Sequence, residues 1–333
     1  MIIKLKKEVD EKKANELARE LQAFVVRQNG SAVLVTPSKV KELEERFRPF
    51  AESSIAFADD IQLASRKFIP HTREIKISDQ VVIGGAAGNS VVITGPCSVE
   101  SEEQIEQCAQ LCVKLNVKIL RAGAFKPRTS PYTFQGMGVE GLKLLDKMRV
   151  KYGLKIISEV RDSTHVGEII EYADIVQIGA KSMYDHGILK ACARTGKPVL
   201  LKRGFGTTVQ EFVQAAEFIL SGGNENVILC ERGIRTFETK TRFTLDLCGV
   251  AWLKEHTNLP IILDPSHAIG YAYGVADLSR ACMAMGVEGL LIETHPNPAV
   301  AKSDASQQLN FEQFTRLYHS LAAVAQAVGR NII

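Results

Sequence analysis

Apolar and polar positions follow two different patterns along the chain, and the change falls near residue 90. From Val91 onward, short and nearly continuous apolar runs alternate with helix-like patterns eight times. Continuous apolar runs are typical of parallel strands that are buried on both faces. The pattern predicts a last helix over about 311–328 and eight strands over residues 91–94, 117–120, 154–158, 174–178, 198–201, 226–229, 259–263 and 288–292.

Eight strand–helix units within about 240 residues fit a (β/α)8 TIM barrel in the α/β class. A doubly wound open sheet is the alternative architecture. That sheet typically carries a Gly-x-Gly-x-x-Gly turn after an early strand, and none is found here. We therefore predict the barrel.

The first 64 residues carry a pattern of their own. Strand-like alternation and helix caps follow one another in the order βα, β, αβ, which predicts a small α+β unit of the ferredoxin-like type. The expected elements are a strand over 3–5, a helix capped by Asp10, a strand over 32–35, a helix capped by Ser38 and a strand over 55–58.

These patterns divide the chain into three parts. Residues 1–64 form the small unit, which we expect to be a regulatory domain. Residues 65–90 form a charged linker and a hairpin, the latter ending near the glycine-rich run at 84–88. Residues 91–333 form the catalytic barrel.

Composition limits the function classes. The chain has 41 Lys and Arg against 38 Asp and Glu, so its net charge of +3 argues against a general nucleic-acid surface. No apolar run reaches the ~18 residues of a membrane span, and the N-terminal pattern does not fit a signal peptide. Seven cysteines without scaffold spacing indicate reduced thiols. We expect a soluble cytoplasmic protein that binds neither nucleic acid nor membrane.

Ionisable residues follow every predicted barrel strand. Because TIM-barrel active sites are built at the C-terminal ends of the strands, these residues should surround one mouth. In chain order they are Cys97, Arg121 with Lys126, Glu159, Lys181 after Gly179-Ala180, Lys202 with Arg203, Glu231 with Arg232, Asp264 with His267, and Glu293 with His295.

Four of the residues around this mouth have metal-ligand side chains. They are Cys97, His267, Glu293 and the later Asp304. Carboxylate and imidazole donors suit Mn²⁺ or Fe²⁺, and the thiolate also admits Zn²⁺ or Co²⁺. Taken alone, Cys97 fits a buried structural thiol better than a ligand. Because His267, Glu293 and Asp304 are also metal-ligand types, we interpret Cys97 as a ligand.

Five cations are also expected around the mouth, namely Arg121, Lys126, Lys181, Lys202 and Arg232. Arginine suits bidentate contacts with carboxylate or phosphate, whereas lysine supplies a point charge. Each cation alone fits a surface ion pair. Five on one barrel mouth indicate a polyanionic substrate.

The motifs that contain these residues resemble those of the 3-deoxy-D-arabino-heptulosonate 7-phosphate (DAHP) synthases. The chain is most similar to the short microbial type with an N-terminal ferredoxin-like regulatory domain. The matching stretches are Gly95-Pro-Cys97-Ser-Val-Glu100, Lys126-Pro-Arg128-Thr129-Ser130, Gln177-Ile-Gly-Ala180, Leu201-Lys-Arg-Gly204, Cys230-Glu-Arg-Gly-Ile-Arg-Thr236, Asp264-Pro-Ser-His267, Glu293-Thr-His-Pro296, Ser303-Asp304 and Gln307-Gln-Leu309.

The resemblance implies condensation of phosphoenolpyruvate with erythrose 4-phosphate and water, the first step of the shikimate pathway. It implies that Cys97, His267, Glu293 and Asp304 bind a divalent metal, with Mn²⁺ expected first and Co²⁺, Zn²⁺ or Fe²⁺ as alternatives. Lys126 is the candidate general acid. For the substrates it implies that Arg121, Lys126 and Lys202 contact the carboxylate region of phosphoenolpyruvate, Ala180, Lys181 and Arg232 its phosphate, Glu159 a nearby water, and Arg128 and Thr129 the erythrose 4-phosphate.

Two positions depart from the family pattern. Lys181 stands where the family usually has arginine, and residues 268–273 lack the basic pair that often follows the histidine. These departures leave open whether another aldose phosphate is used.

Two other functions remain as alternatives. One is a 3-deoxy-D-manno-octulosonate 8-phosphate synthase-like enzyme, and the other is a non-catalytic ligand-binding barrel. The loop Lys126-Pro-Arg128-Thr129 favours the heptulosonate enzyme over the first, and the complete ligand set argues against the second. The resemblance also implies a homo-oligomer, with a tetramer favoured, and an aromatic amino acid as a candidate effector.

Overall fold

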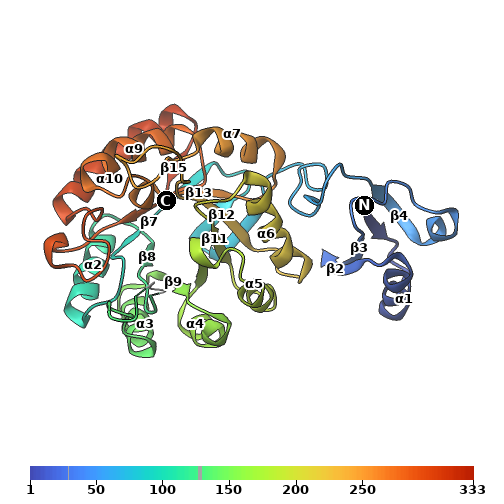
Figure 1. Cartoon of the computed structure of the whole chain (residues 1–333), viewed down its shortest axis with the longest axis horizontal. Helices are drawn as coiled ribbons and strands as arrows, with labels where there is room; N and C mark the ends of the chain where they lie inside the picture. The colour runs from blue at the N-terminus through green and yellow to red at the C-terminus, as the bar shows by residue number, and fades with distance from the viewer. Residues whose placement is uncertain (29, 127–129) are drawn as a thin grey trace.

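The computed structural model describes residues 1–28, 30–126 and 130–333. Figure 1 shows a large unit of alternating strands and helices beside a smaller N-terminal one. Among the described residues, no helix is both long enough and apolar enough to span a bilayer.

The large unit is a closed parallel barrel, as the apolar runs predicted. Its eight strands pair in chain order, and pairing of the last with the first closes the ring. All eight predicted strands are confirmed, with shifts of one to two residues at most ends. The strands are β7 (Asn89–Gly95), β8 (Ile119–Arg121), β9 (Lys155–Val160), β10 (Ile175–Ile178), β11 (Val199–Lys202), β12 (Val227–Glu231), β13 (Ile261–Leu263) and β14 (Gly289–Glu293).

Helices surround this ring (Figure 1). The short β15 (Asn331–Ile332) adds to the start of β7 in parallel. The predicted last helix is confirmed as α10. The helical segments are α2 (Glu102–Lys114), α3 (Val139–Tyr152), η2 (Ser163–His165), α4 (Val166–Tyr172), η3 (Ala180–Ser182), α5 (His186–Ala193), α6 (Val209–Ser221), α7 (Leu247–His256), α8 (Pro265–Ile269), α9 (Ala272–Ala284), η4 (Pro298–Val300) and α10 (Phe311–Ala327).

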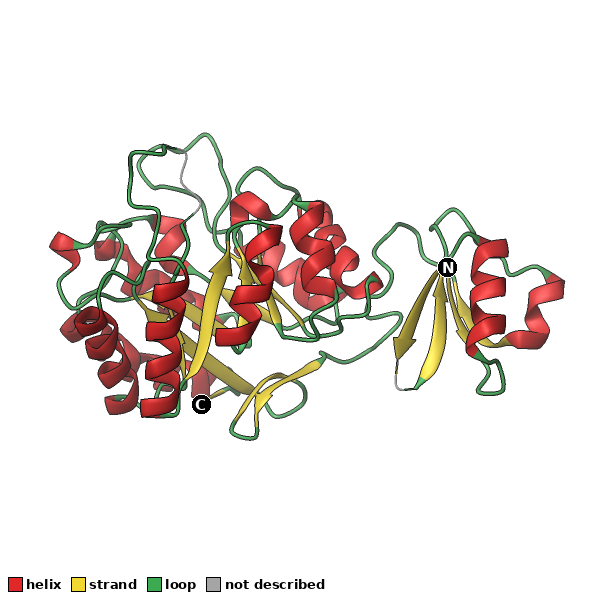
Figure 2. Cartoon of the chain, turned by 90° about the horizontal axis from the view of Figure 1, so that it is seen from below, coloured by secondary structure: helices red, strands yellow, loops and turns green. Residues whose placement is uncertain are grey.

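Two apolar layers hold the barrel together. One layer lies between strands and helices and includes Phe212, Phe314 and Leu290. The other fills the inside of the ring with residues such as Ile93, Ile119 and Ile228. The hairpin formed by β5 (Glu74–Ser78) and β6 (Val81–Gly84) contributes Ile75, Val81 and Ile83 to this inner layer, so it closes the N-terminal end of the barrel (Figure 2). The opposite end stays free for a site.

The N-terminal unit is a four-stranded antiparallel sheet with strand order β2-β3-β1-β4, the order of a ferredoxin-like fold. Its helices lie on the side of the sheet away from the barrel (Figure 2). Asp10 caps α1 as predicted, because its carboxylate accepts from the backbone of Lys13. The elements are β1 (Ile2–Leu5), α1 (Glu11–Leu21), β2 (Phe24–Gln28), β3 (Ser31–Val35), η1 (Glu45–Phe50) and β4 (Ala51–Ile55).

Three expectations for this unit were wrong in detail. The second helix is only the six-residue 3₁₀ segment η1. Pro49 lies inside it and cannot donate a backbone hydrogen bond, so a longer α-helix is disfavoured. Strand β2 was missed, and β4 lies before the predicted residues 55–58. Both are edge strands, and edge strands need not show apolar alternation.

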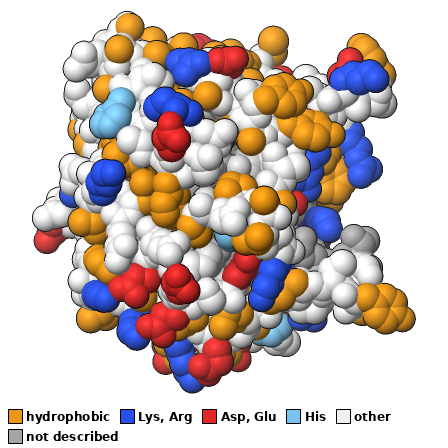
Figure 3. Space-filling view, turned by 90° about the vertical axis from the view of Figure 1, so that its left-hand side faces the viewer, with side chains coloured by type: hydrophobic (Ala, Val, Ile, Leu, Met, Phe, Trp, Pro, Cys, Tyr) orange, Lys and Arg blue, Asp and Glu red, His pale blue; other side chains and the backbone are white. Residues whose placement is uncertain are grey.

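The sheet packs against the barrel through its other face. Val33 and Val35 belong to the same apolar cluster as the barrel helices, whereas Ile3 and Leu34 pack against α1. On the face of the barrel that points away from this sheet, basic and acidic side chains lie among each other (Figure 3). That mixture agrees with the near balance of charges in the sequence.

Candidate active site

The predicted site residues come together at the C-terminal ends of the barrel strands. Arg121, Lys202 and Glu293 are the last residues of their strands, and Cys97, Arg232 and Asp264 follow strand ends within two residues. A cavity of about 130 Å³ opens between them. It is lined by Lys126, Glu159, Ala180, Lys181, Lys202, Phe205, Arg232, Arg242, Phe243, His267 and Asp304.

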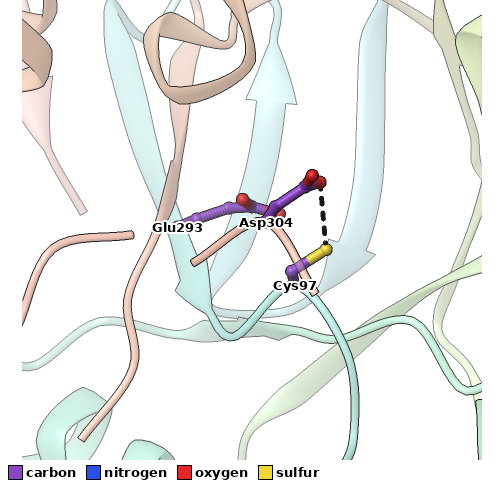
Figure 4. Close-up of side chains that lie close together, drawn as sticks. All are labelled: Cys97, Glu293 and Asp304. Atoms are coloured by element: carbon purple, nitrogen blue, oxygen red, sulfur yellow. Dashed lines mark hydrogen bonds between the residues drawn. The ribbon is translucent and has the colours of Figure 1, made fainter. Parts of the chain in front are cut away.

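Three of the four predicted metal ligands form a tight group. One donor atom each of Cys97, Glu293 and Asp304 lies within 4.8 Å of the others (Figure 4). The fourth, His267, places Nε2 at 3.5 Å from Oε1 of Glu293 and 3.8 Å from Oδ2 of Asp304. One thiol, one imidazole and two carboxylates thus face a common point, and this donor set fits a divalent transition metal.

Cys97 reaches this point because Gly95, two residues earlier, allows a tight turn. Gly95 has φ +143°, and a Cβ atom there would lie 2.1 Å from the carbonyl oxygen of Arg121. Any side chain at this position would push β7 and β8 apart. The glycine therefore lets the chain turn inward directly after β7, which carries Cys97 into the mouth.

The Cys97 thiol is fully buried among polar groups. Its Sγ atom lies 2.9 Å from Oγ of Ser303, 3.1 Å from Nζ of Lys126 and 3.3 Å from Oδ2 of Asp304. Burial raises the pKa of Cys97 to about 12, and the nearby Glu293 adds to the increase while Lys126 opposes it. The thiol is therefore protonated at neutral pH, and a bound cation would have to displace that proton.

Asp264 orients the His267 ring. Its Oδ1 atom accepts from the backbone of His267 at the start of α8, and its Oδ2 atom lies 2.7 Å from Nδ1 of the ring. Lys202 donates to the same Oδ2 at 2.6 Å. Burial acts to raise the pKa of Asp264, but the neighbouring His267 and Lys202 outweigh it and hold that pKa well below its usual range. A charged carboxylate on Nδ1 leaves Nε2 directed at the other ligands, a common arrangement behind metal-binding histidines.

Two more cations are held by hydrogen bonds inside the site. Arg121 donates to Oε1 of Glu293 and to the carbonyl of Pro96, both at 2.7 Å. Lys126 donates to the carbonyl of Cys97 at 3.1 Å. Burial acts to lower the pKa of Lys126, but Cys97 and Glu159 outweigh it, so the net shift is upward. Lys126 therefore remains a protonated donor beside the ligand group.

Arg232 differs from these cations. It is 4% exposed, stacks on the ring of Phe243 at 4.3 Å, and forms no salt bridge within the described part of the chain. Burial lowers its pKa. A buried guanidinium without a carboxylate partner is a ready binding site for an anionic ligand.

The structure also shows functional candidates that the sequence reasoning did not assign. In the sequence, Asp264 stands out only as a strand-end residue within the Asp264-Pro-Ser-His267 motif, without a role of its own. Gln307 donates to Glu293 at 2.6 Å, and Arg242 lines the cavity. Gln307 was noted only within a matching motif, and Arg242 lies on a long loop without any pattern. Predicted residues Arg128 and Thr129 lie outside the described residues.

Several known proteins are similar to this chain. A family model described as the DAHP synthetase I family matches residues 72–329. The phospho-2-dehydro-3-deoxyheptonate aldolase of Thermotoga maritima is 44% identical over 281 residues, which cover 84% of this chain and 82% of that protein. The 2-dehydro-3-deoxyphosphooctonate aldolase of Burkholderia vietnamiensis is 30% identical over 264 residues, which cover 72% of this chain and 92% of that protein.

Two solved structures are similar over the barrel. A crystal structure of phospho-2-dehydro-3-deoxyheptonate aldolase (DAHP synthase) from Thermotoga maritima has a TM-score of 0.80 at 39% identity, and the match covers 100% of this chain and 99% of that one. A truncated form of the Thermotoga maritima synthase has a TM-score of 0.76 at 41% identity, covering 81% of this chain and 98% of that one. The resemblance drawn from the motifs is confirmed, and the chain belongs to the DAHP synthetase I family.

Proposed function

We propose that this chain is a 3-deoxy-7-phosphoheptulonate synthase. It would condense phosphoenolpyruvate with erythrose 4-phosphate and water, giving 3-deoxy-D-arabino-heptulosonate 7-phosphate and phosphate. The observation that carries this proposal is the buried Arg232, which has no carboxylate partner among the described residues and shares one cavity with Lys126, Lys181 and the His267 side of the ligand group. An anion site beside a metal-ligand set is what an enol phosphate and an aldehyde would both need.

The donor phosphate fits the Arg232 side of the cavity. Lys181 and the backbone of Ala180, at the start of η3, line the same cavity. We propose that these three groups hold the phosphate of phosphoenolpyruvate, with Glu159 positioning a water. Gln177 donates to one oxygen of Glu159 at 2.6 Å, which fixes that carboxylate.

The donor carboxylate would lie deeper in the site. Arg121 at the end of β8, Lys126 in the loop that follows it and Lys202 at the end of β11 are all buried there. Two of them already neutralise Glu293 and Asp264, so they set the charge of the site as well as contact the ligand. For the aldose phosphate we retain Arg128 and Thr129 as the proposed contacts.

The residues present fit a divalent metal, and we propose that Cys97, His267, Glu293 and Asp304 hold it. Bound there, the metal would act as a Lewis acid toward the aldehyde oxygen. Mn²⁺ is the proposed metal, because three of the four donors are oxygen or imidazole ligands. Lys126, still protonated and 3.1 Å from Cys97, is the group that can give a proton to the oxygen that gains charge.

An octulosonate synthase remains the second candidate, since a relative with that name is 30% identical. The heptulosonate relative is 44% identical, and a solved heptulosonate enzyme matches the whole chain, including the N-terminal unit. These figures favour erythrose 4-phosphate. The test is phosphate release from phosphoenolpyruvate in the presence of each aldose phosphate.

We propose that the N-terminal unit regulates the barrel, with an aromatic amino acid as effector and a homo-oligomer, favoured as a tetramer, as the working state. This unit packs on the C-terminal half of α6, where a cavity of about 730 Å³ is lined by Phe24, Gln62 and Phe218 among others. Helices of the barrel run opposite to its strands, so this contact lies away from the mouth. Regulation by closure would therefore require movement of the unit. The free thiols support a reducing, cytoplasmic location.

A further inference from the structure

Each carboxylate of the ligand group has two oxygens, and the structure distinguishes them. Glu293 turns Oε1 toward Nε2 of His267, where Arg121 also donates to it at 2.7 Å, and its Oε2 accepts from Nε2 of Gln307 at 2.6 Å. Asp304 turns Oδ2 toward Nε2 of His267 and toward Sγ of Cys97, while its Oδ1 lies 3.5 Å from Nη1 of Arg242. Each residue thus has an inner oxygen facing the ligand group and an outer oxygen that is held elsewhere.

Arg242 lies near the outer oxygen of Asp304 directly and reaches the outer oxygen of Glu293 through Gln307. Nη1 of Arg242 is the atom near Asp304, and it also donates to Oε1 of Gln307 at 2.7 Å. The other end of the Gln307 amide donates to Oε2 of Glu293, so Arg242 also fixes the position of Glu293 indirectly. An amide is suited to that place because it accepts at one end and donates at the other. Gln307 is fully buried, so solvent does not replace these two contacts.

The loop that carries Arg242 is itself fixed. The backbone of Arg242 donates to the carbonyl of Ile269, the last residue of α8. Gly270 has φ +75°, and a Cβ atom there would lie 2.5 Å from Cβ of Arg242. A glycine at this position therefore leaves room for the arginine stem. The segment 268–273 has no cation of its own. Arg242, which comes from another loop, packs against this segment.

We propose that Arg242 and Gln307 act as a positioning pair that selects which oxygen of Glu293 and Asp304 binds the metal. This inference rests on the metal site of the proposed function. It assigns neither residue a direct bond to the metal. Groups of this kind behind the ligands typically change metal affinity by about 10- to 100-fold when they are removed.

The test is Co²⁺ binding to the metal-free full-length protein, followed by calorimetry and by the visible spectrum of the bound ion. Gln307→Leu removes both amide contacts at constant charge, and Arg242→Gln removes the guanidinium. We expect each to weaken Co²⁺ binding about 10- to 100-fold and to change the spectrum. The double variant should lose little more than the worse single one, because the two residues act in series.

Arg235→Gln is the matched control. Arg235 lies on the same loop, but its guanidinium stacks on Phe205 at 4.6 Å instead of contacting a ligand. It should bind Co²⁺ as the wild type does. Thermal unfolding without metal checks that each variant folds, and Gln307→Met replaces Gln307→Leu if the latter does not.

The outcomes separate the two proposals. If wild-type protein binds no Co²⁺, the metal site itself is wrong. If wild type binds but Gln307→Leu and Gln307→Met bind equally well, the positioning pair is refuted. A loss in Arg242→Gln alone would mean that only its charge matters, which also overturns the proposed chain through Gln307.

Discussion

Nζ of Lys126 lies 3.1 Å from Sγ of Cys97 and 3.1 Å from the carbonyl oxygen of the same residue. The proposed general acid is therefore fixed against a proposed metal ligand by two contacts. This arrangement ties proton donation to the place where the aldehyde oxygen would bind. Substitutions can test the two roles separately, with Lys126 as proton donor and Cys97 as metal ligand.

Replacing Lys126 by methionine should remove the proton donor and leave the ligands in place. We expect kcat to fall by about 10²- to 10⁴-fold, the usual contribution of a general acid. Co²⁺ affinity should be retained to within the 10- to 100-fold that is typical for loss of a group contacting a ligand, because Lys126 touches Cys97 but is not itself a proposed ligand. Steady-state kinetics and calorimetry on the same preparation measure both. A variant with nearly normal kcat would remove Lys126 from the chemistry.

Replacing Cys97 by alanine should have the opposite signature. Loss of the thiol should abolish tight metal binding, and turnover should not return with Mn²⁺, Co²⁺ or Zn²⁺. Far-UV circular dichroism should remain native, because the substitution only shortens one buried side chain. In the wild type, a chelator should stop turnover and Mn²⁺ should restore it. Full turnover of metal-free wild type would contradict the ligand assignment.

How far these residues were visible in the sequence depends on the kind of contact. Three of the four proposed ligands and most cations stand at or shortly after strand ends, and barrel closure alone brings them to one mouth, whereas Asp304 lies on the long loop after β14. Gln307 and Arg242 act through contacts between two loops, so no spacing along the chain reveals them. Strands β2 and β4 were missed or misplaced because edge strands are only partly buried, whereas barrel strands are buried on both faces.

Lys181 tests the phosphate side of the cavity. Lys181→Ala should raise KM for phosphoenolpyruvate by roughly 10- to 150-fold, since a charge-assisted contact contributes about 1.5–3 kcal/mol. KM for the aldose phosphate should move much less. Lys181→Arg should retain donor binding, because arginine is the usual family residue. The exposed Lys190 on α5 lies outside the site cavity and provides the control substitution. An unchanged donor KM would leave phosphate binding to Arg232 and the backbone.

Glu217 on α6 links the barrel to the segment that follows the N-terminal unit. One of its oxygens accepts from the backbones of Gln62 and Ala64 at 2.7 and 2.8 Å. Burial raises the pKa of Glu217 from 4.5 to about 7, although these hydrogen bonds oppose the increase. The folded state therefore holds a proton between pH 4.5 and about 7 that the unfolded chain has lost, so the free energy of unfolding should fall as pH rises through that window.

Glu217→Gln keeps the accepting oxygen and removes the charge. The fall between pH 4.5 and about 7 should flatten, by up to about 3 kcal/mol and by less where solvent reaches the carboxyl group. Urea unfolding at several pH values measures this change. Glu42→Gln, at an exposed acid of the N-terminal unit, should leave the pH profile as it is. An identical slope in wild type and Glu217→Gln would mean that this carboxyl group does not control the profile.

The regulatory role of the N-terminal unit is tested by a protein that begins at Ser65. All described residues of the site cavity lie in the barrel, so this protein should keep most of its turnover. It should lose inhibition by tyrosine, phenylalanine or tryptophan. Tenfold inhibition of the full chain requires only about 1.4 kcal/mol of coupling. A full-length enzyme that ignores all three amino acids, or a barrel that stays equally inhibited, would remove the regulatory proposal.

The most direct test of the central claim is phosphate release by the wild-type protein, measured with phosphoenolpyruvate and one aldose phosphate at a time. A seven-carbon product requires four-carbon erythrose 4-phosphate, and an eight-carbon product requires five-carbon arabinose 5-phosphate. We predict rapid release with erythrose 4-phosphate and Mn²⁺, little with arabinose 5-phosphate, and none with chelator. Preference for arabinose 5-phosphate, or no release with either aldose in the presence of metal, would contradict the account.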